Sequence, residues 1–190
     1  MKNVEKLIKE LNVPQNPIEK ALEEPIMDIY RTGKSGTYSH YVDEYHKEIK
    51  ELNENIRNIV KVWRADNCEP NMKLMANKIV IEEAHFSRFL SGQKDISLEK
   101  IDSVLEFVMR EEFKKNNRQY LKDLQLTSES VREALNKWAD DCYNPNFVRV
   151  AEKAGLAYPN LIQFKNNKTN LGKENLKKVY DFLKEQVYEN

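Results

Sequence analysis

The sequence has little glycine or proline, and it lacks stretches in which β-branched residues alternate with polar ones. Five glycines and six prolines occur among 190 residues. Because strands depend on that alternation and tight turns on those two residues, we expect almost no β-sheet. A third of the residues are charged and 40% are apolar, which is typical of a soluble all-α protein.

Long apolar runs are also missing. The longest is a few residues, so no segment is expected to span a bilayer and no membrane partner is expected. Residues 1–12 mix charged and apolar side chains and lack the hydrophobic core of a signal peptide. The expected location is therefore cytoplasmic.

Cysteine is scarce too, with only Cys68 and Cys142, and histidine occurs three times. A structural zinc site needs about four ligands, so we expect reduced thiols and no metal. No paired carboxylates stand beside a candidate nucleophile. The sequence therefore predicts no enzyme and no cofactor.

A surplus of positive charge, common in nucleic-acid-binding proteins, is absent, since 31 basic residues balance 31 acidic ones. The charge is nevertheless segregated. Residues 63–112 hold seven basic and ten acidic side chains, whereas residues 143–190 hold eight basic and five acidic ones. The C-terminal part is therefore better suited to phosphate.

What the sequence does contain is a helical pattern in residues 71–109. Apolar residues recur every three or four positions, as in helices that bury one face. Breaks around Val80–Ile81 and residues 92–96 predict a short helix, a tight turn, a second short helix, a loop and a longer helix.

The same pattern returns 75 residues later, in residues 146–183. Identical residues at this offset indicate an internal duplication that preserves a core. We expect the two tryptophans to anchor the two cores. The identical pairs include Trp63 and Trp138, Asp66 and Asp141, Pro70 and Pro145, Asn71 and Asn146, Ala76 and Ala151, Lys78 and Lys153, Phe89 and Phe164, and Phe107 and Phe182.

Residues 37–66 contain no glycine or proline and predict one long helix with a 3.5-residue apolar repeat. Two interpretations remain open. The helix could form a homodimer, or it could pack on residues 1–30 and enter the core of the first unit. The dimer would use Tyr38, Val42, Tyr45, Ile49, Leu52 and Ile56.

These features divide the chain into four parts. An N-terminal helical segment of residues 1–36, with a helix from Pro17 to about Tyr30, precedes residues 37–112, which combine the long helix with the first unit. Residues 113–127 form a connector. Residues 128–190 form the second unit, in which Ser128 is expected to cap the first helix.

The first unit resembles the phage-repressor (Cro-type) helix-turn-helix family. The resemblance rests on Met75-Ala76, on residues 86–94 (FSRFLSGQK) and on residues 97–99 (SLE). It implies tandem lambda-repressor-like units preceded by a long helix. Val80 replaces the family's usual turn glycine, which the second unit keeps as Gly155, whereas Asn167 replaces the loop glycine.

The resemblance implies that the second helix of each motif enters the major groove of duplex DNA. Arg88 could then read guanine, and Asn160 with Gln163 could read adenine. Glu82 and Glu83 would repel phosphate at the first unit. The candidate DNA-binding residues are Ser87, Arg88 and Lys94 in the first unit, and Tyr158, Asn160, Gln163, Lys165, Asn167, Lys168 and Lys173 in the second.

Two functions follow as hypotheses. The first is a DNA-binding transcriptional regulator of phage or mobile-element type. The second is a protein-interaction module, for example an inhibitor of a host enzyme, that uses the same scaffold to bind a protein. The fold alone does not choose between them, because this scaffold serves both roles.

Overall fold

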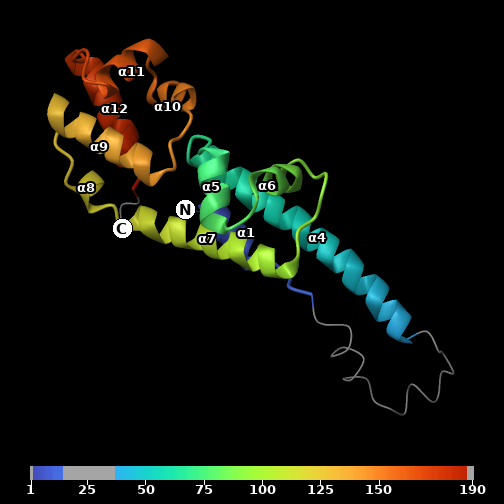
Figure 1. Cartoon of the computed structure of the whole chain (residues 1–190). Coiled ribbons are helices and arrows are strands. Elements are labelled where there is room, and N and C mark those ends of the chain that lie inside the picture. The colour runs from blue at the N-terminus through green and yellow to red at the C-terminus, as the bar shows by residue number, and fades with distance from the viewer. Residues whose placement is uncertain (1, 15–36, 188–190) are drawn as a thin grey trace.

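The computed structural model describes residues 2–14 and 37–187, and this part of the chain contains helices and no strand (Figure 1). The prediction of an all-α protein is confirmed. The helix expected from Pro17 to about Tyr30 lies outside the described residues. None of the described helices has both the length and the apolar character needed to cross a membrane.

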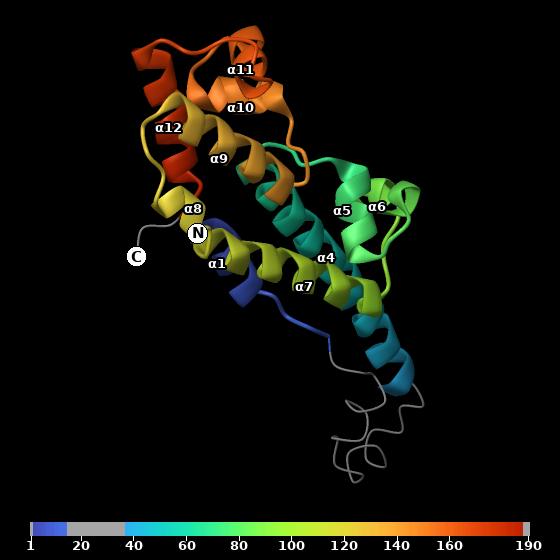
Figure 2. The same ribbon diagram turned by 60° about the vertical axis from the view of Figure 1, so that its left-hand side comes forward.

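The described helices form two units that lie side by side (Figure 1, Figure 2). The first unit comprises α1 (Lys2–Lys9), α4 (Thr37–Asp66), α5 (Met72–Ile79), α6 (Glu83–Leu90) and α7 (Leu98–Asn116). The second comprises α8 (Gln119–Lys122), α9 (Ser128–Asp141), α10 (Phe147–Ala154), α11 (Tyr158–Lys165) and α12 (Lys173–Glu185). The helix predicted over residues 37–66 has the expected bounds.

Side-chain caps fix where several helices begin. Asn71 accepts a hydrogen bond from the Leu74 amide at 3.1 Å, and Asn146 at the equivalent position accepts one from Val148 at 3.0 Å. The expectation that Ser128 caps α9 is wrong. Thr127 is the cap, since its hydroxyl accepts from the Ser130 amide at 3.3 Å.

Each unit has its own core, anchored by the tryptophan that the sequence predicted. The Trp63 and Phe107 rings lie edge to face with centroids 5.3 Å apart, and Trp138 and Phe182 repeat this arrangement at 5.1 Å. Both tryptophans are almost fully buried. The duplicated sequence therefore builds a duplicated core.

Helix α4 belongs mainly to the first unit's core. Leu52 is 1% exposed and Ile56 is completely buried within the chain. The dimer interpretation requires both residues to contact a second copy, and their burial prevents this. Helix α1 packs against α4 as well. Val42, Tyr45 and Ile49 are partly exposed, whereas the Tyr38 side chain lies outside the described residues.

The two units join through a reciprocal backbone contact. The Asn71 amide donates to the Tyr143 carbonyl at 2.9 Å, and the Asn146 amide donates to the Cys68 carbonyl at 2.8 Å. Each pair consists of equivalent residues of the two copies in exchanged roles. This is the pattern of a two-fold interface between identical subunits, here formed within one chain.

Side chains repeat this exchange. Cys68 of the first unit is buried in the second unit's core, and its equivalent, Tyr143, packs against the first unit's core with its ring 5.6 Å from that of Phe107. Lys153 also crosses the interface and donates to the Ala65 and Asp66 carbonyls at 2.9 and 3.2 Å. The carbonyls at the end of α4 are thus satisfied by the other unit.

Candidate nucleic-acid interface

The turn between the two short helices of each unit, α5 and α6 in the first and α10 and α11 in the second, contains a residue in the left-handed conformation. Val80 has φ 61° and ψ 44°, and Gly155 has φ 65° and ψ 38°. The amide that follows each residue donates to the preceding helix: Ile81 to Ala76 at 3.0 Å, and Leu156 to Ala151 at 2.9 Å. The same turn therefore forms whether or not glycine is present.

The loop after the second short helix is repeated as well. Gly92 has φ 79° and Asn167 has φ 58°, and asparagine is one of the few residues that tolerates this region. The Gln93 amide donates to Arg88 at 2.9 Å, and Lys168 donates to Gln163 at 2.8 Å. These bonds fix the loop that carries Lys94 in one copy and Lys168 in the other.

An arginine that the sequence reasoning did not single out holds this loop in each unit. The Arg57 Nε atom donates to the Phe89 carbonyl at 2.7 Å, and that of Arg132 donates to Phe164 at 2.9 Å. Arg57 also pairs with Asp95, and Arg132 bonds the equivalent Asn170. The identity of the two arginines at the 75-residue offset was the signal that could have found them.

The outer face of α6 is exposed but begins with negative charge. Glu82, Glu83, Ser87 and Arg88 are all exposed. Of the predicted cations, Lys94 lies 3.4 Å from the His85 ring nitrogen, beside Glu82. The carboxylates stand at the positive end of the helix, where an incoming phosphate would otherwise be attracted.

The outer face of α11 carries no such carboxylate. Tyr158 is 44% exposed, Asn160 and Gln163 are also exposed, and no acidic residue lies in the first turn. Tyr158 and Asn160 therefore lie in the first turn, at the positive end of the helix, and Gln163 lies about one turn further on. Amide side chains there could form paired hydrogen bonds to a base edge.

The lysines predicted around α11 have different surroundings. Lys168 and Lys173 are exposed, as is Asn167, so the loop after α11 and the first residue of α12 each present a cation. Lys165 is only partly exposed, and its ammonium lies 5.1 Å from the centre of the Phe147 ring. Lys165 therefore makes a cation–π contact within its own unit and is less available to a phosphate.

A cluster of buried polar groups at the connector was also missed by sequence reasoning. The Glu111 side chain is 3% exposed and accepts from Lys114 Nζ at 2.8 Å. Burial, together with a hydrogen bond to Glu111, raises the pKa of Tyr143 well above its ordinary range. No local pattern marks these residues, because the two units bring them together only in the folded chain.

Two further groups complete this cluster. Arg118 donates from Nη2 to Cys142 Sγ at 3.3 Å. Burial raises the pKa of the Cys142 thiol to about 11, so this thiol stays protonated at neutral pH. Cys68 is buried as well and its pKa is also raised, chiefly by burial.

No family model matches the chain, and neither a curated protein nor a solved structure is significantly similar to it.

Proposed function

We propose that the chain is a DNA-binding protein whose two units are helix-turn-helix modules, with α6 and α11 as the helices that approach the major groove. The observation that carries the proposal is the exposed polar face of α11, with Asn160 and Gln163 outward, no acidic residue in its first turn, and Lys168 and Lys173 close by in sequence. Such a face can contact both base edges and phosphates.

The duplicated architecture supports the proposal. Proteins with one such module usually bind DNA as symmetric dimers, so that two recognition helices contact one site. Here the reciprocal contact between Cys68–Asn71 and Tyr143–Asn146 joins two modules within one chain. A homodimer is then unnecessary, which agrees with the burial of Leu52 and Ile56 in the first unit's core.

The two modules would contribute unequally. Glu82 and Glu83 oppose phosphate at α6, whereas the residues around α11 favour it. We therefore assign the main contact to the second unit and a weaker one, centred on Ser87 and Arg88, to the first. A regulator of transcription of phage or mobile-element type is the role that this assignment fits.

The test is the salt dependence of binding to random 30-base-pair duplexes, measured by fluorescence anisotropy. The logarithm of the binding constant should fall linearly with the logarithm of the salt concentration. In the double variant Lys168→Gln/Lys173→Gln this negative slope should become less steep by about 2, since each phosphate contact contributes about 0.9. The matched control is Lys177→Gln/Lys178→Gln, because these lysines pair with Asp181 and Glu174 on α12.

A second function, protein binding, is favoured by one feature of the first unit. Val80 is 77% exposed in a left-handed turn, directly before the acidic start of α6. An exposed apolar side chain beside Glu82 and Glu83 suits a basic protein surface better than DNA. Capture of a protein partner that survives nuclease treatment and is lost in Val80→Asn would support this function.

A further inference from the structure

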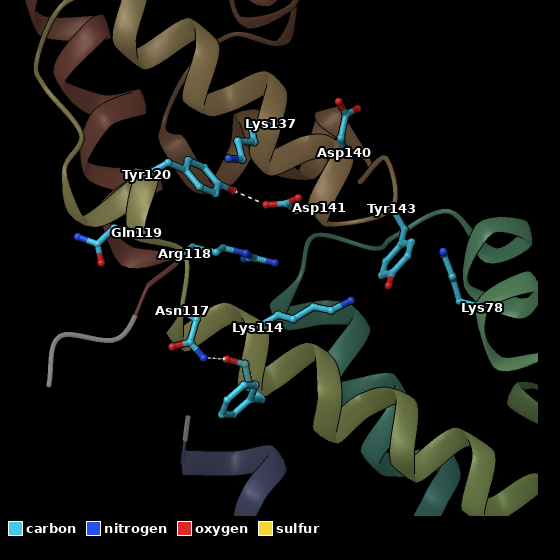
Figure 3. A pocket seen from close by; sticks show the side chains of 11 residues that line it. Lys78, Lys114, Asn117, Arg118, Gln119, Tyr120, Lys137, Asp140, Asp141 and Tyr143 are labelled. Atoms are coloured by element: carbon cyan, nitrogen blue, oxygen red, sulfur yellow. Dashed lines mark hydrogen bonds between the residues drawn. The ribbon is translucent and has the colours of Figure 1, made fainter.

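A cavity of about 600 Å³ lies where the chain passes from the first unit to the second (Figure 3). Its walls come from α5, the end of α7, α8 and the end of α9 together with Tyr143. The volume falls within the range of roughly 300–1,000 Å³ that is typical of small-molecule sites. Both units therefore contribute to one pocket of ligand size.

Arg118 is the unusual residue in this pocket. It is 7% exposed, and its Nη1 atom has no hydrogen-bond partner among the described residues. Its other terminal nitrogen reaches only the neutral thiol of Cys142, at 3.3 Å. Figure 3 shows the side chain extending across the middle of the pocket. A buried cation without a counter-charge is costly, because buried charges are normally paired.

The remaining charged residues of the pocket leave a positive excess. The lining holds four cationic side chains and two carboxylates: Lys78, Lys114, Arg118 and Lys137 against Asp140 and Asp141. One carboxylate is already engaged, since Asp141 accepts the Tyr120 hydroxyl at 2.7 Å. Lys114 is balanced by Glu111, which lies just outside the lining. Lys78, Arg118 and Lys137 then face the two carboxylates, which leaves an excess of one positive charge to attract an anion.

We propose that this pocket binds a nucleoside monophosphate. The phosphate would accept from the Arg118 guanidinium, with Lys78 on the first unit and Lys137 on the second supplying further positive charge. A guanidinium suits a phosphate because its planar donors match the phosphate oxygens. The rings of Phe113, Tyr120 and Tyr143 also line the pocket and could contact a base. This proposal stands independently of DNA binding.

The first experiment compares the four nucleoside monophosphates and inorganic phosphate on the full chain, by calorimetry and thermal unfolding, with sodium chloride at matched ionic strength. At least one nucleotide should bind and raise the Tm. In Arg118→Met, binding should weaken by at least about tenfold, as expected for a lost charge-assisted hydrogen bond. Without ligand, this variant should be no less stable than the natural protein, because a buried unpaired charge has been removed.

The second experiment uses exposed positions, which should leave the fold intact. Lys78→Gln/Lys137→Gln should weaken nucleotide binding, whereas Lys73→Gln, an exposed lysine of the same helix outside the pocket, should not. Equal binding by all variants, or no binding of any nucleotide, overturns the proposal. A duplex that requires Arg118 while no nucleotide binds would also overturn it, because the pocket would then hold a backbone phosphate.

Discussion

Val80 is a single residue whose side chain is poorly suited to the backbone conformation that the fold requires of it. A β-branched side chain in the left-handed region is strained, and the open space around the equivalent Gly155 shows that no neighbour enforces a particular side chain there. The cost of such a residue is of the order of 1–2 kcal/mol. The sequence revealed the departure from glycine, and the structure shows that the turn kept its shape.

Replacing Val80 with glycine should therefore stabilise the protein. We expect the free energy of unfolding, measured by urea denaturation, to rise by about 1 kcal/mol, because the strain is relieved at a position that is already exposed. The reverse exchange, Gly155→Val, should lower it by a similar amount. A decrease in Val80→Gly would mean that the valine makes contacts that outweigh its strain.

Because of Cys142, the stability of the folded protein should decrease at alkaline pH. The folded state raises the thiol pKa from an ordinary value near 9 to about 11, so between these values the unfolded chain loses a proton that the folded chain keeps. The stabilisation is fully present below pH 9 and is lost as the pH rises toward 11. The raised pKa values of Tyr120 and Tyr143 act in the same direction at higher pH.

Urea denaturation at pH 8, 9 and 10 tests this expectation. The free energy of unfolding should fall by about 1 kcal/mol over the last step, since one pKa unit corresponds to about 1.4 kcal/mol. In Cys142→Ala the decline between pH 9 and 10 should be shallower. An unchanged decline in that variant would assign the effect to other groups.

At the scale of the elements, the sequence predicted the helices well because their signals are local. The three- and four-residue apolar spacing and the absence of breaks in residues 37–66 act within single helices. The misplaced cap at α9 arose because Thr127 and Ser128 have equivalent capping chemistry. Only the backbone geometry of Thr127, which is extended at φ −121°, distinguishes them.

Helix α6 allows a direct test of the difference between the two modules. Under the proposed function, Glu82→Gln/Glu83→Gln removes two negative charges from the start of a helix that approaches phosphate. Duplex affinity at low salt should rise by roughly threefold to tenfold, with the gain vanishing at high salt. Glu129→Gln/Glu133→Gln, at exposed positions of α9, is the matched control and should have a smaller effect. Equal effects would show that α6 does not approach DNA.

At the scale of the whole molecule, the sequence revealed the duplication but not how the copies meet. The apolar seam of the long helix left two outcomes open, and the choice depended on which core contains Leu52 and Ile56. The exchange of Cys68 and Tyr143 could not be predicted either. Each residue packs against the core of the other unit, and no pattern within its own unit marks it for that role.

Because Tyr143 links the second unit to the first unit's core, its loss should weaken the whole molecule. We expect Tyr143→Ala to lower the free energy of unfolding by about 2 kcal/mol, below the values of fully buried aromatic residues because the ring is only partly buried. Tyr158→Ala, at an exposed position, should cost much less. Equal costs would mean that the contact between Tyr143 and Phe107 contributes little.

The central claim, that a single chain binds DNA chiefly through α11, is tested most directly by selecting duplexes from a random library with the full-length protein. The natural protein should enrich a defined sequence, Asn160→Ala/Gln163→Ala should lose at least about tenfold in affinity for it, and His85→Ala/Arg88→Ala, at the equivalent positions of α6, should lose less. No enrichment above the starting library, or equal binding by the α11 variant, would contradict the account.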